Sequence, residues 1–400
     1  MDSKKYFDLL KEDGYPLLIF HLLLLHLFTT TISNYTASSL LVKLVSGALL
    51  ITSLYKVRVN FILKDLLTNS KTNLILLLLF FCYPAVSLIY SSNFEFGLQK
   101  LIHLYITIIP IFPAVLLLID QGKEFHIKIV FLSLFYSVLV SVITLAINPF
   151  IHHTAYAFSI SRWSHVLIGR FLSITIIGAL WLILTSTNKK RLYFALTSAL
   201  LIGGALYLSA LRASFLAVSI AALIMFIIVL VKKKLIVKNL LFPIISTVIL
   251  LSVLINFNNP VSDKRFKALY TVITEGKFPD GAILARVEAY IISFEIFKSH
   301  PLLGTGIGGF NNFNESHLTK VIKYPHNLLL EFLTEMGIFF FILSLILFYR
   351  TAIEVYRYNN FLLPIFITAL ILSLFSKDFA SNSLLLMFLP FLIKPPQPNS

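Results

Sequence analysis

The sequence predicts an all-α polytopic membrane protein with about twelve transmembrane helices and one long outer loop. The first observation behind this prediction is composition. Of 400 residues, 58% are hydrophobic and only 13% are charged, whereas a soluble domain is about 25% charged. The second is a mean hydropathy of +0.88. The third is the recurrence of apolar runs of about 20 residues, the length that crosses a bilayer core.

Each apolar run predicts one membrane span. The runs lie near 16–33, 36–54, 73–91, 98–119, 127–147, 165–186, 192–210, 213–231, 238–256, 327–349, 360–376 and 379–393. They divide the chain into three parts. Residues 1–256 hold helices one to nine, 257–325 form the outer loop, and 326–400 hold helices ten to twelve and a short tail.

Lysine and arginine predict the orientation of these spans. Basic residues gather in alternate short loops, as in 56–71, 189–191 and 232–238. Cytoplasmic loops carry such an excess, so both termini are expected in the cytoplasm. The loop 257–325 is then outside. Within it, Val287, Ile291, Phe294 and Phe297 recur at helical spacing, which predicts an amphipathic helix lying across the outer membrane face.

Several cations lie at the outer ends of the predicted spans, where charge is costly and usually faces a polar cavity or a partner. They are Lys43, Lys100, Arg162, Arg170, Arg212 and Lys377. A side chain such as Lys43 or Arg170 can also simply extend to the outer interface. Arg212 fits that explanation less well, because "YLSALRASFLA" leaves almost no loop between two spans. Its guanidinium is expected near the rim of the membrane.

A Pro-His-Asn triplet, Pro325, His326 and Asn327, stands at the outer entry of the tenth span. The simpler interpretation makes Asn327 a helix cap and His326 an interfacial residue. The alternative treats His326 as a base, with free N–H groups and the helix dipole favouring an anion nearby. Together with Arg212 and Arg286, this arrangement suits a substrate that already carries a good anionic leaving group, such as a diphosphate.

Other classes of site are disfavoured. The one cysteine, Cys82, allows neither an intramolecular disulfide nor a thiolate cluster. The glycine run "GTGIGGF" at 304–310 lacks a preceding strand and a following Lys-Ser/Thr, so it predicts a tight turn and no nucleotide site. The net charge of +15 is explained by basic loops beside membrane spans, without nucleic acid.

Four motifs, taken in order, resemble one known family. They are the arginine in "LSALRASFLA", the arginine in "ARVEAY", then "KSHPLLGTGIGGF" and "YPHNLLLEFLTEMGI". Over about residues 190–350 the chain resembles the O-antigen ligase and polysaccharide polymerase superfamily of bacterial envelopes. The resemblance implies a metal-independent, inverting glycosyltransferase of the inner membrane, with its active site on the periplasmic face and no cofactor.

The resemblance also implies substrates and roles. The donor would be a glycan linked through diphosphate to undecaprenol, and the acceptor the lipid A core, both within membrane lipid. Arg212 and His326 would be the catalytic residues. The expected residues for binding diphosphate or substrate are Arg286, Lys100, Arg162, Asn327 and Asp378. Glu331 and Glu335 follow the histidine on one helix face.

Two other functions stay open. A polymerase of the same superfamily would join repeat units instead of attaching glycan to lipid A core. An arginine with glycine eleven residues later, which is associated with some polymerases, is absent at Arg162, Arg212 and Arg286, and this favours the ligase. A transporter would need charged residues near the bilayer midplane and broken spans in paired positions. Spans three to nine are nearly uncharged at mid-depth.

Overall fold

A computed structural model describes most of the chain. It covers residues 3–32, 39–56, 71–147 apart from 120 and 122, 164–232 apart from 210, 281–314, 323–375 and 378–393, with a few single residues between 267 and 276. Arg162, the predicted ninth span at 238–256 and the terminal tail lie outside the described residues.

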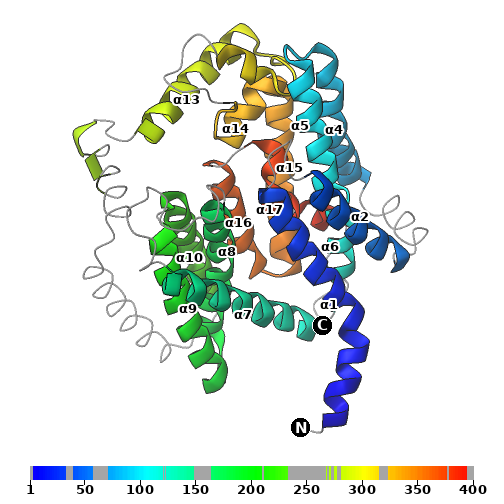
Figure 1. The fold of residues 1–400 in the computed structure, drawn as a ribbon, viewed down its shortest axis with the longest axis vertical. Coiled ribbons are helices and arrows are strands. Elements are labelled where there is room, and N and C mark those ends of the chain that lie inside the picture. Colours follow the sequence, from blue (N-terminus) through cyan, green and yellow to red (C-terminus); the bar gives the residue numbers. More distant parts are fainter. Residues whose placement is uncertain are drawn as a thin grey trace. The chain divides into compact units, whose positions relative to one another are not determined.

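The described residues form helices and no strand, which confirms the all-α prediction. The α-helices, labelled in Figure 1, are α1 (Ser3–Ile32), α2 (Ser39–Lys56), α4 (Lys71–Ser87), α5 (Phe94–Ile108), α6 (Ile111–Ile119), α7 (Lys123–Ile147), α8 (Ser164–Thr185), α9 (Lys189–Ser209), α10 (Arg212–Val231), α13 (Gly281–Ser299), α14 (Leu328–Glu331), α15 (Gly337–Tyr358), α16 (Leu362–Ser373) and α17 (Ser383–Leu386).

Six helical stretches among the described residues are long and apolar enough to cross a membrane. They are Lys71–Tyr90, Phe94–Ile119, Phe125–Ala146, Ile168–Thr185, Arg212–Val231 and Leu328–Tyr358. Shorter apolar helices lie at Gly14–Leu27, Val42–Leu54, Leu362–Ser373 and Ser383–Leu392. The protein is therefore a multi-pass membrane protein, as predicted. The count of twelve spans and their orientation stay predictions.

Three of the predicted spans are interrupted. The span predicted at 98–119 is α5 followed by α6, with Pro110, which has no N–H to donate, between them. The span at 327–349 contains a π-helical turn, η5 (Phe332–Met336), between α14 and α15. The span at 379–393 is a series of short turns, namely η6 (Phe379–Ser381), α17 and η7 (Leu389–Leu392).

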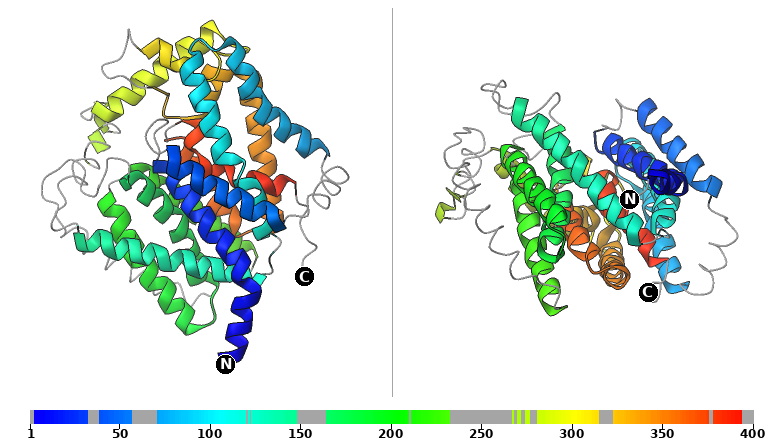
Figure 2. Two further views of the ribbon diagram at one scale, coloured as in Figure 1. Left: turned by 45° about the vertical axis from the view of Figure 1, so that its right-hand side comes forward. Right: turned by 90° about the horizontal axis from the view of Figure 1, so that it is seen from below.

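The chain packs as two compact units. Unit 1 comprises Met1–His126, Ala285–Tyr358 and Ser373–Ser400, and unit 2 comprises Ile127–Leu284 and Asn359–Leu372. In unit 1, α13 lies across one end of the bundle that contains α4, α5 and α15, as Figures 1 and 2 show. In unit 2, the buried core draws mainly on α8, α9 and α10, with fully buried alanines such as Ala179, Ala205 and Ala221.

An aromatic cluster forms part of the core of unit 1. The rings of Phe80 and Phe340 stack with centroids 5.2 Å apart, and Phe332 meets Phe379 edge to face at 5.0 Å. All four side chains are completely buried. Such ring pairs stabilise a core beyond simple burial. The cluster joins α4, η5, α15 and η6, and so holds the segments after His326 and after Asp378 in place.

The glycine run forms the predicted tight turn. Gly304, Gly306 and Gly308 have φ angles of 69°, 81° and 78°, which are strained for residues with a side chain. A Cβ atom at Gly306 would lie 2.7 Å from the Ser87 carbonyl oxygen. The turn also donates from the Thr305 N–H to the Thr334 carbonyl at 2.9 Å. It therefore packs backbone to backbone against the end of α4 and against η5.

The predicted loop helix is α13, and it has two apolar faces. Ala285, Ala289, Ile292 and Ile296 are buried and pack on Phe310. On the other side, Ile291 and Phe294, which belong to the predicted membrane-facing stripe, are 55% and 53% exposed. The small alanines allow the close approach to Phe310 in the turn, and the contact of the exposed stripe with the membrane stays a prediction.

Candidate functional site

His326 has an unusual backbone conformation. Its φ is 58°, and it is the only non-glycine residue with positive φ in the described part of the chain. Histidine is enriched several-fold in this region relative to most side chains, and outliers of this kind cluster at functional sites. The ring is half-buried and meets Tyr324 edge to face with centroids 4.7 Å apart. The imidazole thus sits just before the first helical turn of α14.

Asn327 is the N-cap of that turn. Its side-chain oxygen accepts from the N–H of Leu329 at 3.0 Å and of Leu330 at 3.2 Å. These bonds satisfy two of the N–H groups that a helix start leaves without a partner. Capping is therefore the contact that the structure shows for Asn327, in agreement with the simpler of the two interpretations of the triplet.

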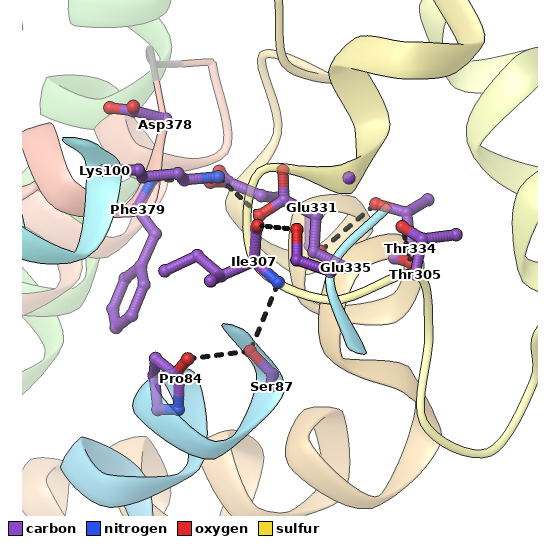
Figure 3. A network of polar contacts seen from close by, with 12 residues as sticks. Pro84, Ser87, Lys100, Thr305, Ile307, Glu331, Thr334, Glu335, Asp378 and Phe379 are labelled. Carbon is purple, nitrogen blue, oxygen red and sulfur yellow. Dashed lines mark hydrogen bonds and ion pairs between the residues drawn. The ribbon is translucent and has the colours of Figure 1, made fainter. Parts of the chain in front are cut away.

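Lys100 lies at the centre of a buried ion-pair network, drawn in Figure 3. Its ammonium nitrogen is 2.5 Å from Glu331 Oε1 and 2.5 Å from Glu335 Oε2, and all three side chains have 0% exposure. The lysine comes from α5, while the glutamates come from α14 and η5. Buried charges need such partners, because an unpaired ion away from water is expensive.

The network also includes a contact with the segment that follows the eleventh predicted span. Glu331 Oε1 accepts a second bond, from the N–H of Phe379 at 2.9 Å. Glu331 Oε2 and Glu335 Oε1 are buried and have no hydrogen-bond partner among the described residues. The network therefore joins α5, the segment after His326 and η6, with more negative than positive charge when its members are ionised.

Asp378 lies immediately before Phe379 and is 1% exposed. Its Oδ1 accepts from the N–H of Ser381 at 3.2 Å, so it caps η6. Burial raises its pKa to about 6, and the bonds from Ser381 offset only part of that effect. The carboxyl thus holds its proton at higher pH than an exposed aspartate.

The predicted arginines are distributed over both units. Arg286 is half-buried on α13, in the same unit as His326. Arg212 is half-buried at the first position of α10, in unit 2. The N-cap of α10, Leu211, provides no side-chain cap, so the positive end of that helix dipole lies beside the guanidinium. Arg162 is outside the described residues.

Arg170 and Arg212 both belong to unit 2, where α8 packs against α10. Arg170 is only 6% exposed on α8. The Ser214 hydroxyl on α10 donates to the carbonyl of Gly169, the residue before Arg170, at 3.4 Å. The sequence singled out Arg170 only as an outer cation able to reach the interface. Its burial beside the start of α10 argues for packing against protein instead.

A comparison with known families matches the part of the chain that contains these arginines and His326. Residues 196–345 match the family described as O-antigen ligase. This stretch is similar to an O-antigen ligase domain. No curated protein matches the chain. The matched stretch includes Arg212, Arg286 and His326, and it also includes the glutamates at 331 and 335.

Within this matched stretch, Glu331 and Glu335 are the residues to which the sequence assigned no role. Their spacing of four places both on one helix face in an otherwise apolar run, and that was the available signal. Their partner Lys100 lies outside the matched stretch and more than 200 residues earlier, with a separation of 235 from Glu335. Only the fold connects them.

Proposed function

We propose that this protein is an O-antigen ligase of the bacterial inner membrane. It transfers glycan from undecaprenyl diphosphate to the lipid A core on the periplasmic face. The observation that carries the proposal is the similarity of 196–345 to an O-antigen ligase domain, with Arg212, Arg286 and His326 in one matched stretch. Helices long enough to cross a membrane support a substrate held in lipid.

The proposed reaction is a single displacement. A hydroxyl of the acceptor sugar attacks the anomeric carbon of the donor, and the bond from that carbon to the diphosphate oxygen breaks. Attack opposite the leaving group inverts the anomeric centre. Undecaprenyl diphosphate leaves as a stable anion, so no general acid is needed. The chain has to supply a base for the hydroxyl proton and positive charge for the diphosphate.

His326 is the proposed base. Its residue is half-buried and stands before a capped helix start, so it keeps some exposed surface. Asn327 supports this position as the cap, which is a more modest role than contact with the substrate. A positioned base of this kind contributes roughly 10²–10⁴ in rate.

Arg212 and Arg286, with Arg162, are the proposed ligands of the diphosphate. A guanidinium presents two parallel N–H groups that match two phosphate oxygens, and it stays charged at any physiological pH. Donors fixed before the reaction stabilise charge as it develops on the leaving group, roughly 10²–10³ in rate for each donor. Asp378, which is buried and caps η6, supports the segment bound to Glu331.

Lipopolysaccharide from a deletion strain tests the proposal. A ligase deletion should leave lipid A core without long chains, while lipid-linked polymer accumulates. The wild-type gene on a plasmid should restore the long chains, and His326→Asn should not. A core that carries a single repeat unit would instead identify a polymerase. An unchanged lipopolysaccharide profile would exclude both activities.

A further inference from the structure

We infer that Lys100 is a positioning residue, which fixes the segment carrying His326 through its ion pairs with Glu331 and Glu335. The inference rests on the proposed function, because it assigns a role within the same site. It replaces the expectation that Lys100 binds the diphosphate. Three features of the structure support it: the burial of the network, the irregular helix that it holds, and its charge.

Burial separates Lys100 from any substrate. The side chain has 0% exposure, and the ammonium has a carboxylate oxygen at 2.5 Å on each of two residues. A diphosphate would have to displace one of them and leave a buried carboxylate without its cation. Breaking a buried ion pair in this way is strongly unfavourable. Lys100 therefore acts through Glu331 and Glu335.

The helical segment after His326 is irregular, so it needs stabilising contacts from another helix. Between the Asn327 cap and Gly337 there is one short α-helical turn and then the π-helical turn η5. Gly337 has a φ of 73°, and the carbonyl of Thr334 is bonded to Thr305 of the glycine turn. Such interruptions weaken the internal bonding of a helix. Lys100 crosslinks this irregular stretch to α5 at two points, five and nine residues after His326.

The charge of the network also supports a positioning role for Lys100. The network holds two carboxyl groups and one ammonium, so the charge of Lys100 is balanced inside the cluster and no positive charge is left for an anion such as diphosphate. A cluster with that balance is suited to holding helices together. Arg212 and Arg286 stay the proposed diphosphate ligands.

The decisive experiment uses steady-state transfer by full-length protein in lipid nanodiscs, with undecaprenyl-diphosphate-linked glycan as donor. Lys100→Met should lower kcat by about 100-fold, as small misplacements of a catalytic group do, while the KM for donor changes less than threefold. The triple variant Lys100→Met, Glu331→Gln, Glu335→Gln removes every charge of the network with similar shapes, and it should recover most of the lost kcat.

A single variant gives opposite results under the two roles. Glu335→Gln leaves the Lys100–Glu331 pair and frees part of the ammonium. If Lys100 positions His326, kcat falls by less than tenfold and the donor KM is unchanged. If Lys100 binds phosphate, losing a competing carboxylate lowers the donor KM. A lowered KM in Glu335→Gln, or an increased donor KM in Lys100→Met, would overturn the inference.

Hydrogen exchange gives a readout that does not depend on activity, and so it separates this inference from the proposed function. Amides of 326–337 should exchange faster in Lys100→Met than in wild type and return toward wild-type rates in the triple variant. Equal exchange in all three proteins would refute the positioning role even if transfer to lipid A core were confirmed. Should Lys100→Met fail to accumulate, Glu335→Gln supplies the same comparison, with a smaller increase in exchange expected.

Discussion

The ring of Tyr324 meets the ring of His326 edge to face, with centroids 4.7 Å apart and planes at 72°. The contact spans a backbone that turns through positive φ at His326 and then enters a helix capped by Asn327. The imidazole thus contacts an aromatic ring, and its own residue has an unusual backbone conformation. Both features can be altered separately.

His326→Asn is expected to fold normally and to be inactive. Asparagine tolerates positive φ as well as histidine does, so the backbone is preserved while the proposed base is removed. The measurement is transfer of glycan to lipid A core, with protein accumulation as the control. Tyr324→Leu should retain activity at a reduced level. An active Asn variant would show that the triplet serves helix entry and not catalysis.

Arg212→Lys should be impaired by at least tenfold although the charge is kept, because an ammonium cannot bond two phosphate oxygens in a fork. Arg191→Lys is the matched control, since Arg191 is exposed near the start of α9 and outside the proposed site. Complementation of a deletion strain measures both. Full activity of Arg212→Lys would show that Arg212 anchors its helix at the membrane interface and does not bind phosphate.

Gly306→Ala should destabilise the protein, by about 2 kcal/mol or more. A Cβ there would lie 2.7 Å from the Ser87 carbonyl oxygen and would be held at a φ of 81°. Gly276→Ala is the control, because its φ is also positive at 64° but nothing lies within 4 Å of the added atom. Thermal unfolding in detergent compares the two. Equal melting temperatures would mean that the turn can move away from α4.

Asp378→Asn should change how stability depends on pH. The folded-state pKa of about 6 lies above the ordinary value of 3.8, so the folded protein holds the proton more tightly than the unfolded chain. Wild type therefore gains stability as pH falls from 7 through 6 toward 4, by an amount of order 3 kcal/mol. The Asn variant should lack this gain and match or exceed wild type at pH 7.5. Melting temperatures between pH 5 and 7.5 measure the difference.

The predicted orientation can be tested with single cysteines. Cys82 is the one native cysteine and is exposed, so Cys82→Ser provides the background. Ser316→Cys should react with a membrane-impermeant maleimide added from the periplasm, and Lys233→Cys only after the membrane is opened. The reverse labelling would place His326 on the face that undecaprenyl-linked O-antigen does not occupy, and would remove the proposed function.

Much of the architecture was predictable because it depends on local sequence. A run of about 20 apolar residues predicts a helix in lipid, since every backbone group must be satisfied within the segment. The entry of the tenth span was visible in Asn327, whose side-chain oxygen accepts from the N–H groups of Leu329 and Leu330. The turn at 304–309 was visible in its glycines, because only glycine adopts such φ angles freely.

The partners of Lys100 were decided by the tertiary structure. By sequence Lys100 is one of several outer cations beside a span, and the family resemblance implied that it binds diphosphate. In the fold its ammonium meets Glu331 and Glu335 from a distance of more than 200 residues along the chain. Charge pairing acts through space and desolvation depends on what surrounds a group. Spacing along the chain therefore showed that two glutamates share a helix face, and only packing showed which cation they bind.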